Sequence, residues 1–421
     1  MLRRYITSTA SIVPLVVLRI LVGVVGLIST VRFMALGWVD NHYAAPHLHF
    51  SYDGFEWVSI PSQPWLDVVY VVMALAALCI ALGAWFRFSS VLFLVLFTWV
   101  FLFDKTYYLN HYYFIMLVSA LLATLPAHKA FSIDLLRRPS LRADRVPRWM
   151  VDVFKLQIGL VYIYAGIAKV NAPWLVDAMP LRMWLPAHDT MPLVGPLLAK
   201  PLTAYVFAWM GMIYDCTIVF FLMHRRTKWY AFVAVVGFHV CTSVLFQVGI
   251  FPYVMIACST IFLFDARYRE SGAVVYSKLV GAIAVFMLVQ VLLPLRPYFY
   301  PGSMFWHEQG YRFGWRVMLM EKAATATFFV KDGEGGREGV VVNGDFLNEM
   351  QERQMSTQPD MILQFAHMLA AHYRMHGMSD PHVRAEVYAT LNAAPGRLLV
   401  DPTRNLAAIQ DGCAPYAWVT P

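Results

Sequence analysis

Long runs of apolar residues, separated by short polar segments, recur through the first 295 residues of the chain. An apolar helix of roughly 17 to 25 residues is long enough to cross a bilayer, so the pattern predicts a bundle of membrane-spanning helices. About nine spans are expected. We assign them to residues 11–36, 65–86, 89–103, 111–127, 151–170, 203–223, 229–248, 250–264 and 273–294.

From residue 295 onward, polar and apolar positions are mixed. The segments ATATFFVKD and REGVVVN alternate in polarity, and the turn-forming DGEGG between them predicts a β-hairpin. The later segment PDMILQFAHMLAAHYRMHG has helical spacing of apolar residues and stops at Gly377. The sequence therefore predicts a polytopic α-helical membrane domain at residues 1–294 and a small α+β domain at residues 295–421.

The composition supports this division. Hydrophobic residues make up 59% of the chain and charged residues only 14%, which is too apolar for an ordinary soluble protein. The N-terminus has the basic start of a signal peptide, but its apolar run is long and lacks a clear cleavage site, so we expect a retained span. The five cysteines have neither disulfide-framework spacing nor a CxxC pair.

The net charge of +7 reflects basic residues concentrated in alternate short loops. These residues are Arg3, Arg4, Arg87, Lys129, Arg137, Arg138, Arg142, Arg145, Arg148, Arg225, Arg226, Lys228, Arg267 and Arg269. The loop at residues 37–64, on the opposite side, contains no Lys or Arg. By the positive-inside rule, this pattern predicts a cytoplasmic N-terminus and an extracytoplasmic tail, and it explains the charge without nucleic acid.

Several ionisable residues fall within or beside the predicted spans. Lys169 ends the fifth span, where its amine either reaches the membrane surface or is held for proton chemistry. His239 lies halfway through the seventh span and needs a partner, such as a backbone carbonyl, or a cavity. No second His or carboxylate lies three or four residues beyond His239, so a metal site is not expected.

Six ordered segments resemble the vitamin K-dependent gamma-glutamyl carboxylase family and its bacterial HTTM relatives. They are HFSYDGFEWV, FLFDKTYYLNHYY, YIYAGIAKVNAPWL, FHVCTSVLFQVGIFPYVM, YRFGWRVMLM and VKDGEGGREGVVVN, and the resemblance covers most of the chain. It implies an enzyme in which a lysine deprotonates vitamin K hydroquinone, which then reacts with O2 to form a strong oxygen base. That base removes a γ-hydrogen from a peptide glutamate, CO2 adds to the carbanion, and the quinone epoxide is left.

The resemblance also implies roles for individual residues. Lys169 matches the catalytic base, His111 matches the histidine assigned to the glutamate carbanion, and Asn110 positions the same region. We expect the cofactor to bind near His239, Tyr162 and Tyr164. Four tail residues either grip the anionic glutamate through guanidinium groups or seal the tail against lipid headgroups; they are Tyr311, Arg312, Trp315 and Arg316.

The chemistry is consistent with an apolar site, because a lysine acts as a base only when neutral and burial disfavours the ammonium. Ala168 stands where animal members carry a second lysine, a departure that bears on how the amine is tuned. The chain also lacks their long C-terminal extension and secretory-pathway signatures, so we expect a bacterial inner-membrane protein that uses menaquinol or phylloquinol and acts on a glutamate-containing peptide or protein. The alternatives are a quinol epoxidase or oxygenase with a different acceptor and a non-catalytic quinone or lipid binder. A transporter is disfavoured because inverted repeats and broken helices are not seen in the sequence.

Overall fold

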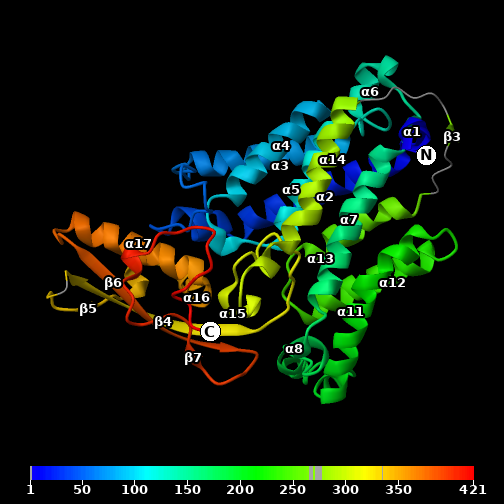
Figure 1. The fold of residues 1–421 in the computed structure, drawn as a ribbon. Coiled ribbons are helices and arrows are strands. Elements are labelled where there is room, and N and C mark those ends of the chain that lie inside the picture. The colour runs from blue at the N-terminus through cyan, green and yellow to red at the C-terminus, as the bar shows by residue number, and fades with distance from the viewer. Residues whose placement is uncertain (1, 265–268, 271–276, 334) are drawn as a thin grey trace.

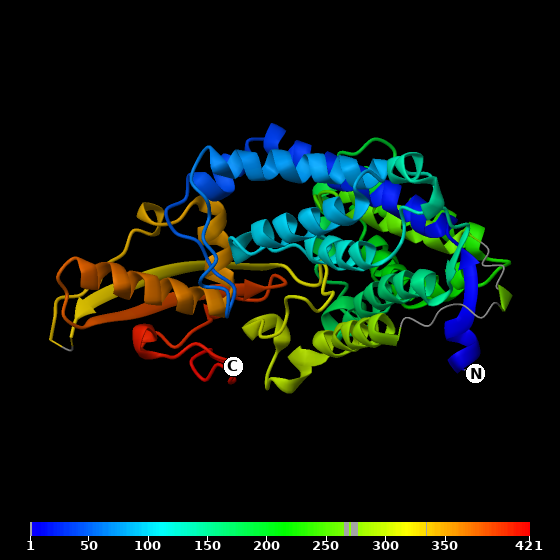
Figure 2. The same cartoon turned by 90° about the horizontal axis from the view of Figure 1, so that it is seen from above.

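The computed structural model describes residues 2–264, 269–270, 277–333 and 335–421 of the chain. Apolar helices form a long bundle, and a smaller sheet-containing domain lies at the end of the bundle away from the N-terminus (Figures 1 and 2). The main bundle helices are α2 (Val13–Ala35), α3 (Trp65–Leu82), α4 (Phe86–Phe101), α5 (Asn110–Thr124), α7 (Trp149–Ala168), α11 (Pro201–Met223), α12 (Lys228–Leu245), α13 (Phe251–Ser259) and α14 (Ser277–Leu292). Short helices between them are α1 (Leu2–Thr7), α6 (Ile133–Arg137), α8 (Ala172–Leu175), α9 (Leu181–Trp184) and α10 (Gly195–Leu198).

Each of the predicted spans overlaps a helix. Among the described residues, six helices are long and apolar enough to cross a membrane. They are Val13–Ala35, Trp65–Leu82, Trp149–Ala168, Pro201–Met223, Lys228–Leu245 and Lys278–Phe299. The last of these is α14 together with the 3-10 helix Leu293–Phe299 that continues it. The predicted nine crossings are therefore not confirmed. Helix α4 has 16 residues, α5 has 15 and α13 has 9, so each of the three is shorter than any of these six.

A small antiparallel sheet gathers several basic loops at the N-terminal end of the bundle. Strand β1 (Ser8–Ser11) lies between β2 (Arg145–Pro147) and β3 (Arg269–Glu270). The loop after α5 and the loop after α13 therefore meet the N-terminus, as the alternation of basic loops predicts. The orientation of this end relative to a membrane stays a prediction, and Arg267 lies outside the described residues.

The C-terminal domain is an antiparallel sheet with two helices on one face. Its strands are β4 (Lys322–Asp332), β5 (Gly339–Val340), β6 (Pro381–Leu391) and β7 (Arg397–Leu398), in the order β5-β4-β6-β7. Helices α16 (Glu349–Thr357) and α17 (Pro359–Met375) pack on the sheet, and α15 (Met304–His307) precedes it. Their shared core includes Phe328 and Phe365, whose rings meet edge to face at 4.9 Å.

The predicted hairpin is present, but it is a minor part of this sheet. Strand β5 pairs with β4 over only two residues, whereas β6 pairs with β4 along its whole length. The predicted helix is also present as α17, and the chain leaves it at Gly377 with a φ of +101°, a conformation that glycine adopts without a Cβ clash.

The C-terminal domain docks onto the polar connection between α4 and α5. Phe50, from the loop after α2, is fully buried in the core of the C-terminal domain. Asp104 accepts hydrogen bonds from Gln351 Nε2 at 2.9 Å and from the backbone N–H of Thr106 at 2.8 Å. Asn348, the N-cap of α16, donates to the hydroxyl of Tyr107 at 3.1 Å.

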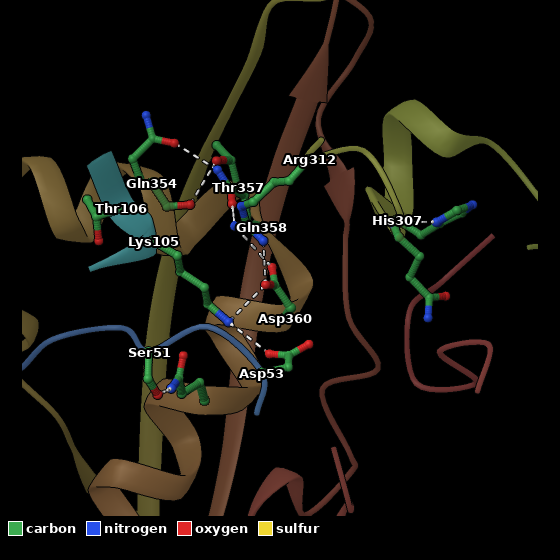
Figure 3. A network of polar contacts seen from close by, with 12 residues as sticks. Ser51, Asp53, Lys105, Thr106, His307, Arg312, Gln354, Thr357, Gln358 and Asp360 are labelled. Atoms are coloured by element: carbon green, nitrogen blue, oxygen red, sulfur yellow. Dashed lines mark hydrogen bonds and ion pairs between the residues drawn. The ribbon is translucent and has the colours of Figure 1, made fainter. Parts of the chain in front are cut away.

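Two buried cations reinforce this contact (Figure 3). Lys105 Nζ lies 3.0 Å from Asp360 Oδ2 and 3.7 Å from Asp53 Oδ1. Arg312 donates to the same Asp360 oxygen at 2.6 Å and also to the side chain of Gln358. The carboxylate of Asp360 therefore joins the α4–α5 connection, the segment leading into the C-terminal domain and the start of α17.

Candidate functional site

Lys169 is the first residue after α7, and its side chain turns into the protein. Only 7% of Lys169 is exposed. Its Nζ donates to Asp215 Oδ2 at 2.7 Å and to the backbone oxygen of Ala165 at 3.2 Å. The amine is therefore buried within the protein, in contact with Asp215.

Asp215, in the middle of α11, is a candidate site residue that sequence reasoning missed. It is 5% exposed and comes from a span that contains no other acidic residue. A carboxylate at membrane depth is costly without a partner, and that rule was the signal that could have identified it. What the sequence does not supply is the pairing with Lys169, since the two residues are 46 positions apart.

Gly166 explains why α7 and α11 come close enough to form this pair. A Cβ placed on Gly166 would lie 2.6 Å from Cys216 Sγ and 2.8 Å from the Cys216 backbone nitrogen. Residues three apart share a helix face, so the Gly-x-x-Lys spacing puts the contact point and the amine on the same side of α7. This contact therefore brings Lys169 against Asp215, the residue before Cys216.

The Lys169–Asp215 pair borders a cavity of about 110 Å³. Most of its wall is apolar, with aromatic rings from α8, α9, α11, α12 and α13, and the polar atoms lie on a few residues. The lining residues are Val161, Tyr162, Ala165, Lys169, Trp174, Leu181, Trp184, Phe207, Gly211, Asp215, Phe238, His239, Thr242, Phe246, Val248, Phe251, Met255, Val317 and Met318. An apolar pocket with a few convergent polar groups is the usual form of a small-molecule site.

His239 and Tyr162 form a second polar group in the same cavity. The hydroxyl of Tyr162 is hydrogen-bonded to His239 Nε2 at 3.0 Å and lies 3.4 Å from Ser259 Oγ. The partner of His239 is thus a tyrosine rather than a backbone carbonyl. The other ring nitrogen, Nδ1, is buried and has no hydrogen-bond partner among the described residues.

Three residues assigned from the resemblance lie outside the cavity lining. The ring of His111 is buried and lies 6.1 Å from the ring of Phe251, which in turn is 5.7 Å from the ring of His239. Asn110 accepts from Tyr108 at 3.0 Å and donates to a backbone oxygen at the start of the C-terminal domain. Tyr164 donates to the backbone of α14 at 2.5 Å and does not reach the cavity.

The four tail residues are each engaged within the protein, and none of them lines the cavity. Burial disfavours the charge of Arg312, but Asp360 outweighs this effect and raises the pKa of Arg312 above its ordinary value. Arg316 is 3% exposed and donates to the backbone oxygens of Pro294 and Gly314. Trp315 stacks on the ring of Tyr113 at 5.2 Å, and the ring of Tyr311 meets that of Phe305 at 6.5 Å.

The part of the chain that the structure describes contains no preformed set of metal ligands. No group of three or more His, Cys, Asp or Glu side chains is arranged there to hold an ion.

Two family models match the chain in succession. Residues 8–266 match the HTTM domain, and residues 276–421 match the lumenal domain of the vitamin K-dependent gamma-carboxylase. The first match alone covers more than half of the chain. No solved structure matches it.

Proposed function

Because the chain belongs to the HTTM and vitamin K-dependent gamma-carboxylase family, we propose that it is an integral membrane γ-glutamyl carboxylase dependent on a reduced isoprenoid quinone. One observation carries the proposal. Lys169, Tyr162 and His239, assigned from two separate sequence segments, line the same apolar cavity. Two independent motifs thus converge on a single small-molecule site.

The cavity residues suit a quinol headgroup. Aromatic walls such as Trp174, Trp184 and Phe251 match a flat apolar ring, while Lys169 and Tyr162 supply polar atoms for its hydroxyl groups. When bound, the reduced quinone supplies, with O2, the strong base that removes the γ-hydrogen of glutamate before CO2 is added. No protein side chain is basic enough for that step.

The protein's own contribution is to handle a proton and to exclude water. Lys169 accepts a proton at Nζ, and the hydroxyl of Tyr162 is held by its hydrogen bond with His239 Nε2. The apolar walls keep the surroundings of Nζ at low dielectric, where a fixed charge acts strongly. Val317 and Met318, from the segment leading into the C-terminal domain, close one side of the cavity.

The peptide glutamate would approach from the side of the C-terminal domain. His111 and Asn110 begin α5 beside that domain, and the ring of His111 lies 6.1 Å from that of Phe251, which lines the cavity. We assign the glutamate to the His111 side of Phe251. The proposal includes a bacterial inner membrane, a cytoplasmic N-terminus, an extracytoplasmic C-terminal domain, and menaquinol or phylloquinol as the cofactor.

The first experiment measures O2-dependent epoxidation of vitamin K hydroquinone by the full chain in lipid nanodiscs. We expect Lys169→Ala to abolish the quinone epoxide detected by chromatography. Lys200→Ala, which removes an exposed lysine at the start of α11, is the matched control and keeps the wild-type rate. Undiminished epoxide formation by Lys169→Ala refutes the assigned base.

A second candidate, a quinol oxygenase with an acceptor other than glutamate, is favoured by one observation: none of the four tail residues expected to bind glutamate lines the cavity. Mass spectrometry of glutamyl peptides supplied with bicarbonate separates the two. A mass gain of one CO2 supports the carboxylase, and epoxidation without that gain supports the other acceptor. Quinone binding with neither product supports a non-catalytic binder.

A further inference from the structure

Asp215 has no role in any of the sequence motifs, yet it is the direct partner of the proposed base. We infer that Asp215 is a positioning residue for Lys169, which aims the amine into the cavity and stabilises the ammonium formed when Nζ takes up a proton. The catalytic part of this inference rests on the proposed function. The pairing itself does not.

The contact is short and buried, and it fixes the position of the amine. The Nζ and Oδ2 atoms are 2.7 Å apart, and the two side chains are only 9% and 7% exposed. A further bond to the oxygen of Ala165 and the ring of Trp174, whose centroid is 5.5 Å from Nζ, limit the other positions of the amine. Contact of α7 with α11 at Gly166 holds the backbones that carry both groups.

Asp215 supplies the formal charge at this site. The other titratable groups near the pair are Tyr162 on α7, Tyr214 and Cys216 on α11, and His239 on α12. The two tyrosines and Cys216 are weak acids, and His239 is hydrogen-bonded through Nε2 to the Tyr162 hydroxyl, so none of the four balances a buried ammonium. In a site of low dielectric, a lone charge is far more costly than a paired one.

The consequence concerns how strong a base Lys169 is. A lysine alone in an apolar cavity stays neutral, but it is a weak base because the ammonium it would form has no counter-ion. With Asp215 ionised, a new N–H bond at Nζ converts an amine–carboxylate contact into an ion pair. The carboxylate therefore favours proton uptake at Nζ.

The test measures the protonation of Lys169 directly, on quinone-free protein in nanodiscs. A small apolar acylating reagent modifies only the neutral amine, and mass spectrometry quantifies modification of Lys169 across a pH series. We expect the midpoint for Asp215→Asn to fall by about 2 pH units, since an adjacent opposite charge shifts titration by roughly 1 to 3 units. At a pH below both midpoints, Lys169 of the Asp215→Asn variant should therefore be modified about 100-fold faster than Lys169 of the wild type.

Three controls define the outcome. Asp215→Glu keeps the charge and should titrate close to wild type. Asp177→Asn removes an exposed carboxylate near the same end of the bundle and should leave the midpoint unchanged. The third control is exposed Lys200, whose modification should be identical in all variants. Equal midpoints in wild type and Asp215→Asn overturn the inference.

If Asp215→Asn is not recovered as folded protein, the double variant Lys169→Met with Asp215→Asn tests whether the two residues form a pair. Removal of both charges should restore folded protein if the two form the pair, and failure of the double variant as well overturns the inference. In an active wild type, Asp215→Asn should also move the acid limb of the epoxidation rate to lower pH and lower the plateau. Absence of epoxidation in wild type refutes the proposed function alone, because the titration of Lys169 is read without turnover.

Discussion

Replacing Asp360 with asparagine tests the docking of the C-terminal domain. Asp360 is the shared partner of Lys105 and Arg312, and the three side chains are 15%, 2% and 19% exposed. Removing one member of a buried charge network costs about 3 to 5 kcal/mol because the other charges remain buried. Lys105 retains Asp53 at 3.7 Å, but that carboxylate is 73% exposed and therefore screened.

We therefore expect a loss near the lower end of this range, about 3 kcal/mol. For a domain of this size, it corresponds to a fall of roughly 10 °C in the melting temperature. The assay is thermal unfolding in nanodiscs, followed by tryptophan fluorescence. Asp345→Asn, which alters an exposed carboxylate of the same domain, is the matched control. If the two variants melt at the same temperature, Asp360 does not hold the docked arrangement.

The pH dependence gives an independent check on the cause. Burial opposes ionisation of Asp360, but Arg312 and Lys105 outweigh it and hold the pKa of Asp360 well below its ordinary value. A carboxyl group whose pKa is lowered by folding stabilises the protein above its unfolded pKa, about 3.9, and loses that contribution as the pH falls. The difference between wild type and Asp360→Asn should be constant from about pH 7 to pH 5 and should shrink below about pH 4. A difference that disappears near neutral pH contradicts this assignment.

Two further predictions concern the cavity. Gly166→Ala should destabilise the protein by about 1 to 3 kcal/mol and reduce epoxidation, because the new Cβ would lie 2.6 Å from Cys216 Sγ. The control is Gly237→Ala, where a new Cβ has no heavy atom within 4 Å. Equal melting temperatures for the two variants would refute the close contact at Gly166. Tyr162→Phe should raise the KM for the quinol and cost about 1 to 2 kcal/mol in unfolding, since its hydroxyl faces two buried polar groups. Tyr164→Phe should leave the KM unchanged, and equal effects of the two substitutions would contradict the cavity assignment.

The bundle and the start of the C-terminal domain could be predicted because their patterns are local. Apolar runs indicate helices regardless of their neighbours, and the DGEGG turn indicates a hairpin between adjacent segments. The main partner of β4 is β6, which returns to the sheet after two helices. Such a pairing depends on packing over a long chain separation, which local alternation does not encode. The short α4 and α13 likewise have spanning composition without spanning length.

The residues of the candidate site likewise could be identified from local sequence, whereas their partners could not. Lys169 and His239 could be identified because an ionisable residue in an apolar run is conspicuous. Asp215 is equally conspicuous, but its partner is set by the contact at Gly166. Arg312 was expected to grip the glutamate or to seal the tail against lipid headgroups, and the structure has it, together with Lys105, on Asp360. Charge alone does not distinguish a residue that binds a ligand from one that holds two domains together.

The docking contact and the cavity wall are linked by a single short segment. Arg312 holds Asp360, while Val317 and Met318, only a few residues later, line the cavity. Between them, the backbone oxygen of Arg316 accepts a hydrogen bond from Asn110 at 3.0 Å. A segment fixed at both ends transmits a displacement at one end to the other. We therefore expect loss of the Asp360 contact to loosen the cavity wall beside Lys169 as well as the domain interface.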